Sequence, residues 1–154
     1  MPKNLTQRTK LVHYVCAALL LVLLVMQFTP FWHYGEAGET VSISGYIWFP
    51  SDHNDLTSYL QQMVGSDFTI DTILVPCILM LLLSAAGAVL CVIKPGEWLA
   101  SLLAVACGLS GVIGFLTCPA LRLGSAWAMQ LLLCILLLCG GGYAFYLAVA
   151  SAKA

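Results

Sequence analysis

Four stretches of the chain are apolar for about 20 residues each, with no Asp, Glu, Lys or Arg except at their edges. About 20 apolar residues in a helix cross the hydrocarbon core of a bilayer, where no water can bond an open backbone. The expected spans are residues 10–28, 72–93, 98–117 and 125–150. We therefore predict an all-α membrane protein, a four-transmembrane-helix bundle, with residues 1–154 forming a single membrane domain.

The composition also indicates a lipid environment. Hydrophobic residues make up 61% of the 154 residues and charged residues 8%, whereas soluble domains carry about 25% charged residues. A chain this apolar cannot cover its own surface with polar groups in water. It also has no basic patch of the kind that nucleic-acid binding requires, so we expect the lipid bilayer and no nucleic acid among its partners.

The first span has a basic flank, as a signal peptide does. Residues 27–32, however, read Gln-Phe-Thr-Pro-Phe-Trp and lack the small-x-small pattern of a cleavage site. We expect an uncleaved signal anchor.

The basic residues indicate an orientation. With a cytoplasmic N-terminus, Arg122 is the one basic residue outside, and the other five lie inside: Lys3, Arg8, Lys10, Lys94 and Lys153. Because cytoplasmic loops are enriched in Lys and Arg, we expect both termini in the cytoplasm and loop 29–71 to be extracytoplasmic. The expected location is the plasma (inner) membrane, with several passes.

Loop 29–71 is longer than an ordinary connector and has a pattern of its own. Residues 40–49 are β-branched and aromatic, and residues 31–34 could pair with them across a turn at 35–38, which predicts a small β-hairpin. Residues 51–54 supply helix N-cap side chains, and Gly65 is a natural helix end. The apolar stripe between them predicts a short amphipathic helix: Leu56, Tyr59, Leu60, Met63 and Val64.

This loop also holds the candidate recognition residues. Its aromatic side chains form either an interfacial belt with a miniature core or a surface for a partner or ligand: Trp32, Tyr46, Trp48, Phe49 and Tyr59. Imidazoles and carboxylates in the loop are weak metal-ligand candidates: His33, His53, Glu36, Asp52 and Asp55. Their spacing matches no established metal motif, and helix capping and solvation explain them, so we expect no metal and no cofactor.

The third span contains two series of small residues spaced by four. We expect these to let helices approach closely in lipid, and we select five of the span's small residues as helix-packing positions: Ala100, Ala104, Gly108, Gly111 and Gly114. The series Ala106, Ser110 and Gly114 leaves an alternative, in which one small face docks another chain.

The polar residues within the spans supply little chemistry. The cysteines include no CxxC pair. A membrane thiol oxidoreductase needs paired cysteines near the outer surface, where Cys118 is expected to lie and Cys77 is the second candidate, so we interpret the set as packing residues. His13 is expected to be interfacial or hydrogen-bonded, with a proton relay as the alternative. Gln130 is expected to bond to a neighbouring helix. The absence of an acid or base at depth counts against a proton-coupled exporter, and a self-sufficient ion channel would need a polar pore lining.

The outline of four spans with cytoplasmic ends and a strand-bearing outer loop resembles the claudin-type tetraspan architecture. The likeness is one of topology. The loop reads Ser44-Gly45-Tyr46-Ile47-Trp48, without the claudin Gly-Leu-Trp motif or loop cysteines, so no function or residue is transferred.

The leading hypothesis is a small non-enzymatic membrane protein that works through protein–protein contacts. It would be an accessory subunit of another membrane protein or a self-associating tetraspan, with the outer loop as recognition element. The alternatives are a transporter-like protein that binds lipid or another apolar ligand, and a membrane enzyme with its site at the outer interface.

Overall fold

The computed structural model describes residues 3–28, 33–34, 41–42, 57–58, 61–62, 65–67, 69, 71–118, 121 and 127–153. Its main elements are four long helices: α1 (Lys3–Met26), α4 (Asp71–Ile93), α5 (Trp98–Thr117) and α6 (Trp127–Lys153). Each contains a stretch long and apolar enough to cross a bilayer: Thr6–Met26, Leu74–Ile93, Trp98–Thr117 and Trp127–Ala152. The prediction of a multi-pass, four-helix membrane protein is confirmed.

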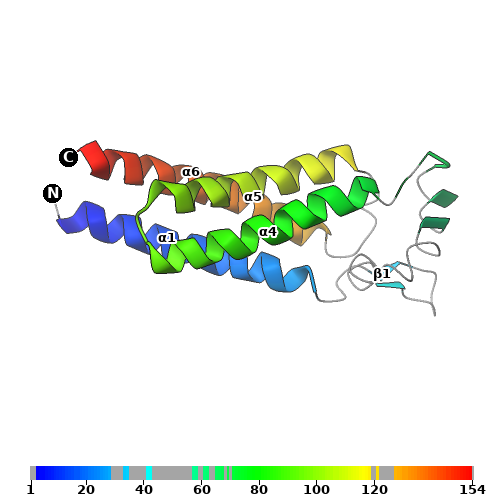
Figure 1. Ribbon diagram of the computed structural model, residues 1–154, viewed down its shortest axis with the longest axis horizontal. Helices are drawn as coiled ribbons and strands as arrows, with labels where there is room; N and C mark the ends of the chain where they lie inside the picture. Colours follow the sequence, from blue (N-terminus) through cyan, green and yellow to red (C-terminus); the bar gives the residue numbers. More distant parts are fainter. Residues whose placement is uncertain are drawn as a thin grey trace.

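The helices form an up-and-down bundle in which α1 packs on α4 and α6, and α5 packs between α4 and α6 (Figure 1). Helices α1 and α5 face each other across the diagonal. Both termini lie at the same end of the bundle as the turn between α4 and α5. This shared end is the one that the basic residues assign to the cytoplasm.

The helix boundaries differ from the predicted spans mainly in α1. The apolar run begins at residue 10, but the helix already begins at Lys3 and includes the polar segment before that run. At its other end α1 closes in a turn, with Gln27 N–H donating to the Leu24 carbonyl oxygen at 3.1 Å.

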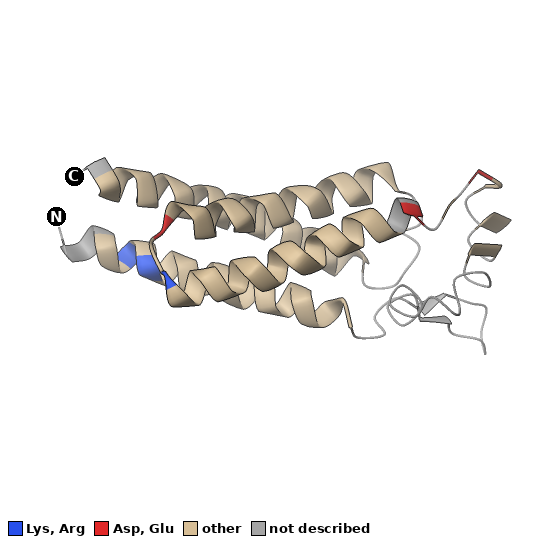
Figure 2. Cartoon of the chain, in the orientation of Figure 1, with Lys and Arg blue, Asp and Glu red and all other residues tan. Residues whose placement is uncertain are grey.

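A tight turn joins α4 to α5. Gly96 has a φ of +103°, a backbone conformation that side chains with a Cβ rarely adopt. The side chains of Lys94 and Glu97 form an ion pair at 3.5 Å on the outside of this turn. Charged residues otherwise gather at the two ends of the bundle and leave its long sides without charge (Figure 2).

Large apolar side chains cover the outside of the bundle, including Leu116 and Ile93, which are each 68% exposed. The interior instead holds small residues, leucines and cysteines. An apolar outer surface of this extent is stable only in contact with lipid or with another protein.

The outer β-hairpin that the sequence predicted is not supported as a folded unit. The pairing that the structure describes is two residues long on each side: β1 (His33–Tyr34) runs antiparallel to β2 (Val41–Ser42), with His33 opposite Ser42. A pairing this short adds little stability, because even a longer isolated hairpin is marginal in water.

Parts of the predicted loop helix can be followed. The backbone is helical at residues 57–58 and 61–62. Gly65 has a φ of +132°, and its N–H donates to the Gln61 carbonyl oxygen at 3.0 Å, as expected for a glycine at a helix end. The remainder of the predicted hairpin and helix lies outside the described residues.

Candidate functional site: a membrane-facing groove between α4 and α5

One small-residue face of α5 is buried against α6. Ala100 and Ala104 are at most 1% exposed. A Cβ added to Gly108 would lie 2.6 Å from the Cys134 carbonyl oxygen, which only a glycine avoids. From α6, Gly141 approaches α5 in the same way, since its added Cβ would lie 3.2 Å from the Ala104 Cβ. This face brings two helix backbones together, the arrangement that small residues permit in lipid.

Gly111 belongs to the same interior region. An added Cβ would collide with the Cys134 thiol and lie 3.1 Å from the Met80 Sδ atom, so side chains from α4 and α6 fill the space that this glycine leaves. Gly114 instead faces α4, where its added Cβ would lie 2.8 Å from the Pro76 Cβ. All five predicted packing residues are therefore buried, and Gly114 also borders a groove between α4 and α5.

The other small-residue series lies beside α4, where Ala106 and Ser110 are half-buried and Gly114 is buried. Ala106, Ser110 and Gly114 line one side of a groove of about 710 Å³ between α5 and α4. The groove opens to the outside of the bundle, since its bordering side chains Leu109 and Ile113 are each about half exposed. From Ala106 to Thr117 it follows α5 for about three turns, or about 17 Å at the helical rise of 1.5 Å per residue.

The lining of the groove is almost entirely apolar in character. The Ser110 hydroxyl donates to the Cys107 carbonyl oxygen at 2.9 Å, and the Thr117 hydroxyl donates to the Ile113 carbonyl oxygen at 2.8 Å. Both hydroxyl protons are therefore engaged within α5. Asp71, the first residue of α4, is the charged residue in the lining, and among the described residues it forms no ion pair.

A second polar group lies at the opposite end of the bundle, around His13 on α1. The imidazole is 0% exposed, with Nδ1 2.7 Å from the Thr9 carbonyl oxygen and Nε2 2.9 Å from the Ser101 Oγ atom. The Glu97 carbonyl oxygen lies 3.2 Å from Nε2. A ring protonated on Nδ1 donates to Thr9 and accepts the Ser101 hydroxyl proton. The contacts fit the expected hydrogen-bonded histidine.

This His–Ser pair does not form a catalytic site. Both side chains are buried, and the nearby Glu97 carboxylate pairs with Lys94. The pair instead fastens α1 to the start of α5. The sequence did not identify Ser101 as a partner of His13. The two residues are 88 positions apart, and no sequence pattern links a serine inside an apolar run to so distant a residue.

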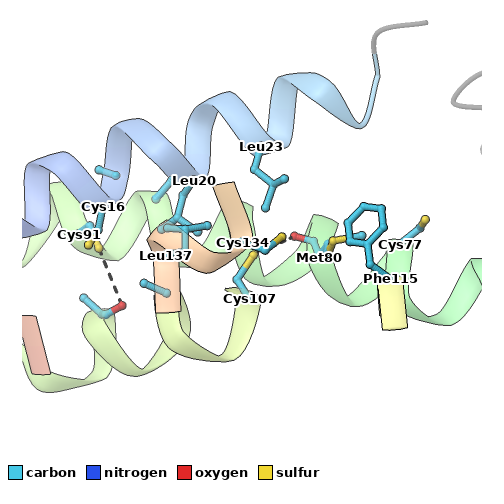
Figure 3. Close-up of a cluster of buried hydrophobic side chains, with 14 of the residues drawn as sticks. Cys16, Leu20, Leu23, Cys77, Met80, Cys91, Cys107, Phe115, Cys134 and Leu137 are labelled. Carbon is cyan, nitrogen blue, oxygen red and sulfur yellow. Dashed lines mark hydrogen bonds between the residues drawn. The ribbon is translucent and has the colours of Figure 1, made fainter. Parts of the chain in front are cut away.

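The cysteines are distributed through the core among leucine, methionine and phenylalanine side chains (Figure 3). All seven are free thiols, and Cys139 is the exposed one. Two thiols make long contacts to backbone carbonyl oxygens, Cys91 to Ala100 at 3.8 Å and Cys107 to Met80 at 3.7 Å. These placements are those of small apolar packing residues.

Gln130 on α6 is 0% exposed, and neither its amide nitrogen nor its amide oxygen has a hydrogen-bond partner among the described residues. The expected bond to a neighbouring helix is therefore not found in that part of the chain.

Most of the loop candidates lie outside the described residues: Trp32, Glu36, Tyr46, Trp48, Phe49, Asp52, His53, Asp55 and Tyr59. His33 is placed only as backbone in β1. Within the described residues, no group of three or more His, Cys, Asp or Glu side chains could hold a metal ion.

No protein-family model, curated protein or solved structure matches this chain. Its function therefore has to be argued from its own surfaces.

Proposed function

We propose that this protein works through protein–protein contacts in the membrane, by accepting a transmembrane helix of another protein in the groove between α4 and α5. The observation that carries the proposal is the groove beside α4, which is lined on α5 by the half-buried Ala106 and Ser110 and by the buried Gly114. The matching inward face of α5 is already used against α6. Ala106 and Ser110 leave a hollow beside α4, where lipid-facing helices usually present large side chains.

The physics of the bilayer favours such an occupant. Apolar burial gives no net drive to helix association in lipid, so association depends on close packing, which small residues allow. A groove about 17 Å long would contact about three turns of a docked helix. Because the hydroxyls of Ser110 and Thr117 are engaged within α5, the groove would recognise shape rather than hydrogen-bonding groups.

The proposal includes an orientation and a location. The termini and the turn at residues 94–97 would lie in the cytoplasm of a plasma (inner) membrane, and loop 29–71 outside. The groove would then open toward the outer half of the bilayer. The loop would contact the outer part of the same partner through Trp32, Tyr46, Trp48, Phe49 and Tyr59.

A second candidate function uses the same groove. Its volume of about 710 Å³ is within the range of small-molecule sites, about 300–1,000 Å³. A lipid chain or another apolar molecule held there would make this a lipid-binding or transporter-like protein. An enzyme site at the outer interface would depend on His53 and loop acids outside the described residues, and no observation favours it.

Photo-crosslinking in native membranes tests the proposal. A photoreactive amino acid replaces Leu109 in the groove or, as the matched control, Leu132, an exposed leucine on α6. We expect a discrete adduct from position 109 whose crosslinked peptide is a transmembrane segment, and no such adduct from position 132. The variant Ala106→Leu, which fills the groove, should remove the adduct, whereas Ala128→Leu on exposed α6 should retain it.

Two results would contradict the proposal. Equal protein adducts from both positions would mean random contact in the membrane. Adducts from position 109 with lipid alone would support the second candidate function.

A further inference from the structure

The outer end of the groove carries a charge that its apolar remainder does not explain. Asp71 begins α4 and borders the groove with an exposed side chain. The partial positive charge at the N-terminal end of a helix favours an acidic residue there. Its carboxylate forms no ion pair within the described part of the chain.

The surrounding charge has the same sign. Loop 29–71, which ends at Asp71, has six of the seven acidic residues of the chain and no Lys or Arg. A helix docked in the groove would leave it next to Asp71, the residue at which this acidic segment joins α4. A neutral flank on that helix would gain no electrostatic attraction there, and an acidic flank would be repelled.

We infer that the partner is a transmembrane helix with a Lys or Arg at its outer flank, and that Asp71 selects it by charge. This inference rests on the proposed function and names the partner's chemistry. Basic residues are scarce on the outer flanks of spans, so a single carboxylate there separates such a helix from most other membrane helices. Packing in the groove would attract any helix with small side chains on one face, and Asp71 would discriminate between helices with and without a basic outer flank.

Purified protein and synthetic membrane-spanning peptides test this inference. Two peptides share one Leu/Ala host sequence with a Gly-x-x-x-Gly face, and differ only in carrying Lys or Gln at both ends. Symmetrical ends make the result independent of peptide orientation. Association with the fluorescently labelled protein in phosphatidylcholine vesicles is measured by energy transfer at low salt.

We expect the Lys-flanked peptide to associate about threefold more tightly than the Gln-flanked one, a ratio within the range of partly exposed ion pairs. Asp71→Asn should remove this difference while leaving association of the Gln-flanked peptide unchanged. Asp67→Asn is the matched control, because Asp67 is an exposed acid four residues earlier that does not line the groove. High salt should reduce the difference in the original protein.

The outcomes separate the two proposals. Equal association of the two peptides would overturn the role of Asp71, and so would a loss of the difference between them in Asp67→Asn. If Ala106→Leu still abolished binding of both peptides in that case, the groove would remain supported as a helix site. Failure of both peptides to associate would overturn both proposals.

Discussion

At the scale of single residues, the most specific polar arrangement is the contact of His13 with Ser101. Both side chains are buried, and their hydrogen bond joins helices that face each other across the bundle. The sequence could predict that His13 would be hydrogen-bonded, because an imidazole near a membrane interface is costly to bury without a hydrogen-bond partner. It could not name Ser101, since the pairing depends on how α1 and α5 pack. Loss of either partner should leave a buried polar group unpaired.

Ser101→Ala should therefore destabilise the bundle by about 1–2 kcal/mol, the cost of an unsatisfied buried group. Denaturant unfolding in detergent, followed by tryptophan fluorescence, measures the free energy. Ser84→Ala is the matched control, because Ser84 is equally buried but its hydroxyl bonds only to the Leu81 carbonyl oxygen of its own helix. Equal effects from both variants would show that the contact with His13 adds no stability.

At the scale of elements, α5 is the helix on which the bundle and the groove both depend. The sequence shows two small-residue series on this helix but not which one lies inside, because both repeat every four residues. The packing of the neighbouring helices determines which series lies inside. Helix α6 covers the face of Ala104 and Gly108, whereas the face of Ala106 and Ser110 lines the groove. The spans themselves were predictable because lipid allows only long apolar helices. The outer hairpin was not supported, since β-branched alternation alone cannot hold so short a pairing together.

Gly108→Ala should separate α5 from α6 and destabilise the protein by about 1–3 kcal/mol, because its Cβ would press on backbone atoms of Cys134 and Leu138 that cannot rotate away. Gly142→Ala on α6 is the control. Among the described residues, no atom outside its chain neighbours and its own helix backbone lies within 4 Å of its added Cβ, so this change should be neutral or stabilise the helix by up to about 1 kcal/mol. Thermal unfolding of both variants in the same detergent gives the comparison. A stable Gly108→Ala protein would contradict the close contact between the two helices.

At the scale of the whole molecule, two ends of different charge and an apolar body define how the protein sits in a bilayer. Both termini and the turn between α4 and α5 share one end (Figure 1). The positive-inside bias predicts that this shared end lies in the cytoplasm. Residue counting could supply that orientation, but the groove could not be predicted, because it exists only where α4 and α5 lie side by side.

Cysteine labelling in intact cells tests the orientation. Ser66→Cys, near the start of α4, should react with a membrane-impermeant maleimide, whereas Lys94→Cys should react only after the cells are permeabilised. The original protein is the control for its seven native cysteines, six of which are buried. The reverse pattern would place the basic end outside.

A photo-crosslinking scan along α5 tests whether a protein helix occupies the groove between α4 and α5. A photoreactive residue is placed at each exposed or half-exposed position from 102 to 117 in native membranes, and the yield of protein adduct is measured at each. We predict that the yield rises with helical periodicity at the groove positions Ala106, Leu109, Ser110, Ile113 and Thr117, and falls at Leu102 and Leu116 outside it. A yield that does not vary with position, or one that peaks outside the groove, would contradict the binding of a protein helix in the groove.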